Sequence, residues 1–217
     1  DEIEVLSRAE TPPIDIDDRI DPSEELRLKY RYLDLRRPKM QNRLVIRHNA
    51  AQAARSYLNK NHFLEIETPM LVRATPEGAR DYIVPSRVNP GKFYALPQSP
   101  QIYKQILMVS GCDRYYQFAR CLRDEDLRQD RQPEHTQIDL EMSFIDANDV
   151  MDMVEGLYKH IMKEVLGINI KQKFSRIPHK EAIEKYGSDK PDLRFGLEFI
   201  DVTEEAKGCG FQIFNKA

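Results

Sequence analysis

The sequence predicts an α+β fold in which helices flank an antiparallel sheet. Two long segments with helical periodicity, within residues 42–63 and 146–167, enclose two alternating segments at 114–123 and 136–146. The two alternating segments follow one another along the chain, which predicts an antiparallel hairpin with a long connection. The order helix, strand, strand, helix is typical of α+β domains rather than of repeated βαβ units.

The composition is that of a globular protein with a sizeable core, since 41% of the 217 residues are hydrophobic and 32% are charged. The net charge is −3, and the charged residues form no block of a single sign along the sequence. We therefore expect no DNA binding through a basic face. We expect no membrane span, because no run approaches roughly 18 apolar residues, and no secretory signal. The three cysteines and five histidines lack the spacings of a metal site. We therefore expect a cytoplasmic or organellar protein that binds no metal through these residues.

The N-terminal part of the chain changes character near residue 25. Residues 1–25 are acidic and rich in turn residues, which predicts a linker or hinge, and residues 2–6 alternate like the end of a strand. Residues 25–40 are basic and helical, and we expect Pro38 to end that helix. The long helix after it carries an alanine-rich contact stripe formed by Ile46, Ala50, Ala53, Ala54, Tyr57 and Leu58.

Three shorter strands are expected after the long helix. Residues 63–71 form a strand that Pro69 interrupts. Because proline donates no hydrogen bond to a sheet, this strand should lie at an edge or at an interface. Residues 82–87 and 92–96 predict two further short strands.

Two more helices complete the pattern. The first is compact, with Ser99 as its N-cap, Pro100 at its first position and Gly111 just past its end. The second, within residues 146–167, ends at Gly167 and has one apolar face, formed by Val150, Val154, Leu157, Ile161 and Val165.

The predicted hairpin has one apolar and one polar face, because side chains alternate across a strand. The apolar face carries Tyr116, Phe118 and Leu122 on the first strand, and Ile138, Leu140, Met142 and Phe144 on the second. The polar face carries Gln117, Ala119, Cys121 and Arg123, then Gln137, Asp139, Glu141 and Ser143. Small residues beside long polar ones leave room for a ligand; a solvated outer face is the alternative from the pattern alone.

The connection between the two strands holds opposed charges: Arg123, Arg128 and Arg131 with Asp124, Glu125, Asp126 and Asp130. Exposed ion pairs contribute only about 0–1 kcal/mol each, so stability is a weak reason for them. Arginine forks suit phosphate oxygens, and nearby acids suit the amino group of a base or Mg²⁺. The sequence contains neither GxxxxGK[ST] nor GxGxxG, so arginines and metal would have to hold a nucleotide here.

Several blocks of the sequence resemble the class II aminoacyl-tRNA synthetases. FLEIETPML is similar to motif 1, and RCLRDEDLRQDRQPEH is similar to motif 2. RYLDLRRP, ATPEGARDY, LPQSPQIYKQ, DRQPEHTQID and YGSDKPDLRF resemble the bacterial-type aspartyl enzymes, over residues 26 to about 199. The resemblance implies a class II synthetase-like antiparallel sheet flanked by helices. It implies that residues 1–25 end an anticodon-binding domain and form a hinge, that 26–195 are catalytic, and that 196–217 begin an insertion domain.

The resemblance also implies roles for individual residues. Arg123 is implied as catalytic, at the α-phosphate and the amino-acid carboxylate, and Pro69 as part of a dimer interface. The implied aspartate-binding residues are Glu77, Ser99, Gln101, Lys104, Arg123 and Asp139. The implied ATP-binding residues are Arg123, Asp124, Glu125, Arg131, Gln132 and His135. His135 stands where the family usually has a phenylalanine that stacks on adenine, and an imidazole offers less area for that contact.

The chemistry of these residues suits the implied substrate. Gln101 and Lys104 are three residues apart and share one face of their helix. The Lys104 ammonium suits the carboxylate of an aspartate side chain, whereas Glu77 and Asp139 suit its α-ammonium group.

The resemblance implies an enzyme that activates L-aspartate with ATP and Mg²⁺ and then charges tRNA-Asp, as a homodimer formed through motif 1. Whether tRNA-Asn is a second acceptor stays open. Motif 3 does not occur in these residues, so we expect the chain to be inactive alone. The alternatives are a non-catalytic synthetase-like binding or regulatory module, and the related asparaginyl enzyme.

Overall fold

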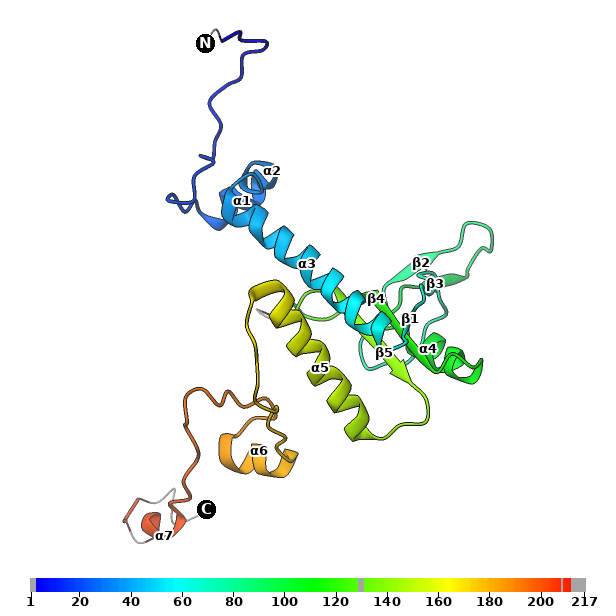
Figure 1. Cartoon of the computed structure of the whole chain (residues 1–217), viewed down its shortest axis with the longest axis vertical. Coiled ribbons are helices and arrows are strands. Elements are labelled where there is room, and N and C mark those ends of the chain that lie inside the picture. Colours follow the sequence, from blue (N-terminus) through cyan, green and yellow to red (C-terminus); the bar gives the residue numbers. More distant parts are fainter. Residues whose placement is uncertain (1–2, 129–130, 208, 212–217) are drawn as a thin grey trace. The chain divides into compact units, whose positions relative to one another are not determined.

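The computed structural model describes residues 3–128, 131–207 and 209–211 (Figure 1). Contacts divide the chain into two compact units, Asp1–Lys171 and Gln172–Ala217. The domain boundaries expected at residues 25 and 195 remain predictions. Among the helices of the described residues, none is both long and apolar enough to cross a membrane.

The segment before the first helix is partly bound to the helices that follow it. Ile14 is buried, the Lys39 N–H donates to the Asp18 carboxylate at 2.8 Å, and Arg37 donates to the Ile20 carbonyl at 2.9 Å. Residues 3–6 pair with no strand among the described residues, and the expectation that they end a strand of a preceding domain stays a prediction.

A buried carboxylate joins the first three helices, α1 (Glu24–Lys29), α2 (Arg31–Asp34) and α3 (Pro38–Lys60). The Asp34 side chain accepts hydrogen bonds from Arg31 at 2.6 Å, Arg37 at 3.1 Å and Arg27 at 3.2 Å. Burial acts to raise the pKa of Asp34, but the hydrogen bonds from Arg27 and Arg37 and the arginine charges outweigh it and lower this pKa. The α1–α2–α3 junction is therefore held by an ionised side chain.

The expectation that Pro38 ends a helix is wrong. Pro38 is the first residue of α3, where its missing N–H has no intrahelical partner to lose and its fixed φ suits the helix. The break lies before it, since Arg37 is extended.

The long helix α3 packs along α5 (Ala147–Leu166), and the two lie side by side in Figure 1. Asp146 forms a capping box with Asp149 at the start of α5, and Gly167 ends it in the left-handed conformation, as predicted. A Cβ on Gly156 would collide with the Tyr57 hydroxyl, so this glycine allows the close approach of the helices. The core cluster consists of Ala54, Leu58, Phe63, Tyr116 and Leu157.

The main sheet has three strands in the order β1, β4, β5. Strand β4 (Arg114–Leu122) pairs antiparallel with β5 (Glu134–Met142), which confirms the hairpin, and β1 (Leu64–Glu65) pairs parallel with β4. Side chains on one face of the β4–β5 pair, those of Tyr116, Phe118, Leu140 and Met142, pack in the core with α3 and α5. The polar face of the β4–β5 pair points away from α3 and α5.

Two details of the strands differ from expectation. Only Leu64–Glu65 of the predicted strand 63–71 pairs, at the sheet edge, and Pro69 is exposed beyond it. The second hairpin strand ends at Met142, so the placement of Phe144 on the apolar face is wrong. Phe144 is 98% exposed and has a left-handed φ of 55°.

A small hairpin and a helix complete the first unit. Both predicted short strands form, as β2 (Ile83–Pro85) and β3 (Phe93–Ala95), and they pair antiparallel; α4 (Gln101–Val109) follows. The expectation that Ser99 caps α4 is wrong, because Pro100 occupies the cap position and the Ser99 hydroxyl binds elsewhere. Gly111 lies just past the helix with a φ of 86°.

The second unit contains α6 (His179–Tyr186) and α7 (Thr203–Ala206). Gly187 ends α6 with a φ of 66°, and the Phe199 N–H donates to the Lys185 carbonyl at 2.6 Å.

We predict that Asp34→Asn lowers the free energy of unfolding by about 3 kcal/mol at pH 7, because three arginines lose a buried partner. The folded pKa of Asp34 is below its ordinary 3.8, so its contribution is present above that pH and is lost as the pH falls toward the folded value. Urea unfolding measured between pH 7 and pH 3 should show the gap to wild type narrowing in acid.

Asp15→Asn is the matched control, since Asp15 is exposed and should leave the unfolding free energy within about 0.5 kcal/mol of wild type. A gap between wild type and Asp34→Asn that stays constant with pH would contradict the role given to the Asp34 carboxylate.

Candidate functional site

The candidate site lies on the polar face of the β4–β5 pair. Cross-strand partners place Gln117 opposite Asp139, Tyr115 opposite Glu141, and Cys121 opposite His135 on this face. Helix α4 and the loop of residues 72–82 supply the remaining groups. The expected polar floor is therefore confirmed in its register.

Lys104 of α4 is bound by two carboxylates of β5. Its Nζ lies 2.9 Å from Asp139 Oδ1 and 3.1 Å from Glu141 Oε2, and the Lys104 and Asp139 side chains are only 11% and 10% exposed. Burial acts to lower the pKa of Lys104, but the hydrogen bonds and charges of Asp139 and then of Glu141 outweigh it and raise this pKa. The ammonium group therefore stays charged, with one of its three N–H donors left for a ligand.

Asp139 also presents an open acceptor. Its Oδ2 atom is buried and has no partner of hydrogen-bond geometry among the described residues; the Tyr115 hydroxyl, whose pKa is raised by burial and then by the Asp139 carboxylate, donates to Gln117 instead. A buried carboxylate oxygen without a donor is costly, so this atom suits a ligand that brings one, such as an ammonium group.

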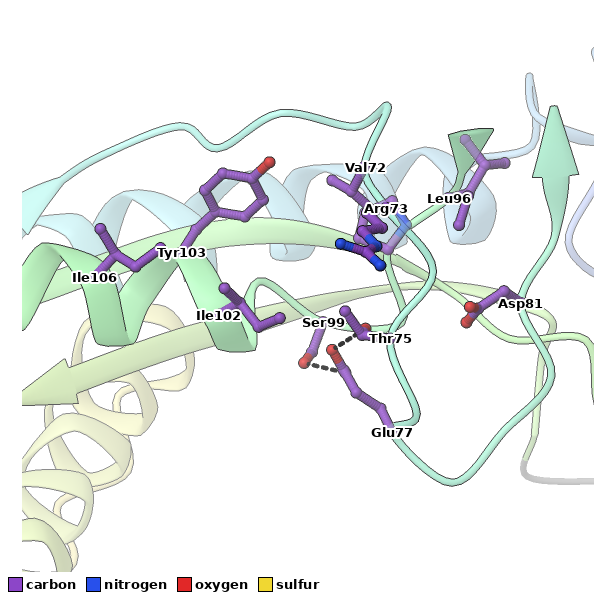
Figure 2. A pocket seen from close by; sticks show the side chains of 12 residues that line it. Val72, Arg73, Thr75, Glu77, Asp81, Leu96, Ser99, Ile102, Tyr103 and Ile106 are labelled. Atoms are coloured by element: carbon purple, nitrogen blue, oxygen red, sulfur yellow. Dashed lines mark hydrogen bonds between the residues drawn. The ribbon is translucent and has the colours of Figure 1, made fainter. Parts of the chain in front are cut away.

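Glu77 lies across from the start of α4, in the loop. Its carboxylate accepts hydrogen bonds from Thr75 Oγ1 at 3.0 Å and from Ser99 Oγ at 2.7 Å, and both bonds are drawn in Figure 2. The three side chains line a cavity of about 250 Å³ whose wall is otherwise largely apolar, with Ile102, Tyr103 and Ile106 of α4. Gln101, at the first turn of α4, is half-buried.

Arg123 follows the last residue of β4. Its backbone N–H donates to the Pro133 carbonyl at 2.8 Å, which closes the base of the hairpin loop. Its Nε–H is buried and finds no acceptor within the described ranges of the chain. An unpaired guanidinium donor suits a carboxylate or a phosphate oxygen.

Cys121 is buried on the same sheet face. Burial is the main cause that raises the pKa of its thiol; the charges of Asp139 and Glu77 also raise it, whereas those of Arg123 and Lys104 lower it. A thiol with a raised pKa is a poor nucleophile, so the site is suited to binding and positioning rather than to covalent catalysis by Cys121.

The hairpin loop forms a second cavity, of about 300 Å³, with arginines and acids together in its wall. The lining side chains include Arg80, Arg128 and Arg131, and also Asp124, Glu125 and Asp126. Arg131 Nη1 lies 3.7 Å from Glu125 Oε2, and Gln132 is exposed. Asp130 lies outside the described residues. His135 is half-buried on β5, on the same face as Asp139.

Three contributors were missed by sequence reasoning. Glu141 was placed on the polar floor but not among the binding residues, although its alternation with Asp139 was a usable signal. Thr75 binds Glu77 two residues further on, and Gln98 binds the loop from 19 residues away, a contact that no local pattern reveals.

The described residues bring together no group of three or more histidine, cysteine, aspartate or glutamate side chains able to hold a metal ion. The acids of the loop cavity are interspersed with arginines.

The fold is that of the class II aminoacyl-tRNA synthetases. The solved structure of asparaginyl-tRNA synthetase from Pyrococcus horikoshii complexed with asparaginyl-adenylate is similar, with a TM-score of 0.62 and 28% identity. The similarity covers 68% of this chain and 33% of that one. The model of the tRNA synthetases class II (D, K and N) matches residues 23–210, and the chain belongs to this family.

Curated relatives narrow the comparison. The chain is 60% identical over 217 residues to the aspartate–tRNA ligase of Clostridium perfringens (strain 13 / Type A). It is 59% identical over 215 residues to the aspartate–tRNA(Asp/Asn) ligase of Caldanaerobacter subterraneus subsp. tengcongensis. These alignments cover 100% and 99% of the chain, which spans about 36% of the length of either relative.

We predict that Lys104→Met lowers the free energy of unfolding by about 3 kcal/mol, because it leaves Asp139 and Glu141 side by side without their cation. A second change, Asp139→Asn, should recover part of that loss, and chemical denaturation of the two single variants and the double variant measures the coupling.

The control is Lys180→Met, which removes a highly exposed lysine paired with Glu184 and should change the unfolding free energy by less than about 0.5 kcal/mol. Additive effects of Lys104→Met and Asp139→Asn would show that the pair is not coupled.

Proposed function

We propose that this chain forms the aspartate-binding and ATP-binding part of an enzyme that makes aspartyl-adenylate and charges tRNA-Asp with it. The main support for this proposal is a pair of buried atoms at one sheet face that have no hydrogen-bond partner. They are Asp139 Oδ2, an acceptor, and Arg123 Nε, a donor. An amino acid beside a nucleotide phosphate supplies both missing partners. The names of the curated relatives support this choice.

The aspartate molecule would lie among Lys104, Asp139, Glu77 and the start of α4. Its α-ammonium group would donate to the open Asp139 oxygen and to Glu77, while its side-chain carboxylate would accept the remaining N–H of Lys104. Ser99 and Gln101 would line the same side of the pocket. The reacting α-carboxylate would then face Arg123.

ATP would lie at the end of the hairpin, where the loop cavity opens. Arg123 would hold the α-phosphate and Arg131 a phosphate further along, with Asp124 and Gln132 beside them. Glu125 would accept the adenine amino group, and His135 would stack on the base.

The proposed reaction is a displacement at phosphorus. A carboxylate oxygen of aspartate attacks the α-phosphorus, the bond from that phosphorus to its bridging oxygen breaks, and pyrophosphate leaves. No side-chain nucleophile is needed, so positioning and neutralisation of charge by Arg123 supply the catalysis. Mg²⁺ normally accompanies ATP, and among the described residues no group of three or more histidine, cysteine, aspartate or glutamate side chains could hold it without the phosphates.

The proposal extends to partners. The acceptor is tRNA-Asp, and relatives named for both tRNA-Asp and tRNA-Asn make tRNA-Asn a second candidate to be tested in the same assay. The protein would act in the cytoplasm as a homodimer in which Pro69 and the rest of motif 1 form the seam.

The test is aspartate-dependent exchange between ATP and pyrophosphate, measured with the chain extended to the length of its relatives. We predict exchange with aspartate, far less with asparagine, and none from the 217 residues alone. Arg123→Ala should reduce kcat by about 100-fold or more, as loss of a donor to developing charge does. Arg87→Ala, an exposed arginine of the β2–β3 turn, should leave the rate unchanged.

Absence of exchange with any amino acid would favour the non-catalytic binding module over the enzyme. Preference for asparagine would favour the asparaginyl enzyme.

We also predict that His135→Phe lowers the dissociation constant for ATP by about threefold, since phenyl offers more stacking area than imidazole. Calorimetric titration with ATP measures this. Equal ATP dissociation constants for the wild type and the His135→Phe variant across pH 6 to 8 would show that His135 does not contact adenine.

A further inference from the structure

The loop that carries Glu77 is held at its base by one buried side chain, that of Gln98. Gln98 is 3% exposed. Its amide oxygen accepts the Ala79 N–H at 3.1 Å, and its amide nitrogen donates to the Ala79 carbonyl at 2.9 Å and to the Asp81 carboxylate. Both amide hydrogens and the oxygen are thus bound to residues 79–81.

Two backbone hydrogen bonds fix the same stretch from other directions. The Arg80 carbonyl accepts the Asp124 N–H at 3.0 Å, and the Tyr82 carbonyl accepts the Leu96 N–H at 2.9 Å. Residues 79–82 therefore form a fixed base that touches the start of the hairpin loop beside Arg123.

Glu77 joins this base through a single flexible residue. Gly78 has a φ of 102°, a conformation that only glycine adopts readily, and open space surrounds the position of a Cβ. Glu77 itself is held only by the side chains of Thr75 and Ser99 among the described contacts. Its position therefore depends on the base at one end and on two hydroxyl groups at the other.

We propose that Gln98 is a positioning residue that couples the aspartate half of the site to the ATP half. The inference rests on the proposed function. Without the Gln98 amide, the Ala79 N–H and carbonyl lose their buried partners, and the base shifts to find new ones. That shift displaces Glu77 on one side and Asp124, next to Arg123, on the other.

The experiment compares three variants of the protein at its relatives' length, in aspartate-dependent ATP–pyrophosphate exchange. Gln98→Ala should raise KM for aspartate and KM for ATP, each about tenfold, as loss of one to two buried hydrogen bonds does, and change kcat less. Ser99→Ala releases Glu77 alone and should raise only KM for aspartate. Gln105→Ala, an exposed glutamine on α4, should change neither.

Hydrogen exchange gives a second readout that does not depend on catalysis. The Ala79 amide should exchange about tenfold faster in Gln98→Ala than in wild type or Ser99→Ala. If Gln98→Ala fails to fold, Gln98→Asn keeps the amide but shortens the reach, and it should change both KM values and the Ala79 amide in the same direction.

The outcomes separate the two proposals. An active wild type whose Gln98 variants keep both KM values, or raise only one of them, overturns the coupling role and leaves the proposed function standing. Unchanged exchange at Ala79 also overturns it. A wild type without aspartate-dependent exchange overturns the proposed function and the coupling role with it.

Discussion

The antiparallel register of β4 and β5 is the constraint on which the core and the site both depend. Arg114 pairs with Met142 and Leu122 with Glu134, so every side chain between them has a fixed partner and a fixed face. The apolar face meets α3 and α5, and the polar face meets α4. A slip of one residue would reverse the faces of one strand, so that either Tyr116 of β4 turned outward or Asp139 of β5 entered the core. Because burial of the apolar face fixes this register, it also fixes where the charged side chains stand on the polar face.

The charges on the polar face are only partly satisfied within the chain. Lys104 is shared by Asp139 and Glu141, which holds the three side chains together with one more formal negative charge than positive. Among the residues described, Asp139 Oδ2 and Arg123 Nε are buried without a hydrogen-bond partner at this site, and Arg37 Nε is buried without one at the α1–α2–α3 junction. Buried polar groups in proteins nearly always have partners. The two atoms at this site are therefore the groups on this face that a ligand could supply with partners.

Periodicity predicted the hairpin, both long helices and the polar floor, because side-chain alternation and the helical repeat follow directly from backbone geometry. The resemblance to a known family brought Glu77, Lys104 and Asp139 to one site, which no local pattern does. Errors arose where one residue type serves two structures. Pro38 begins a helix as readily as proline ends one, and Ser99 binds Glu77 instead of capping α4. The role of Gln98 rests on contacts 17 and 19 residues away, which the sequence does not reveal.

The most direct measurement of the central claim is a crystal structure of the protein, at the length of its relatives, with a non-hydrolysable aspartyl-adenylate analogue. We expect the analogue's ammonium group to donate to Asp139 Oδ2, its phosphate-like oxygens to accept from Arg123, and the β4–β5 register to stay unchanged. An analogue bound away from this sheet face, with both atoms still without partners, would contradict the proposed site.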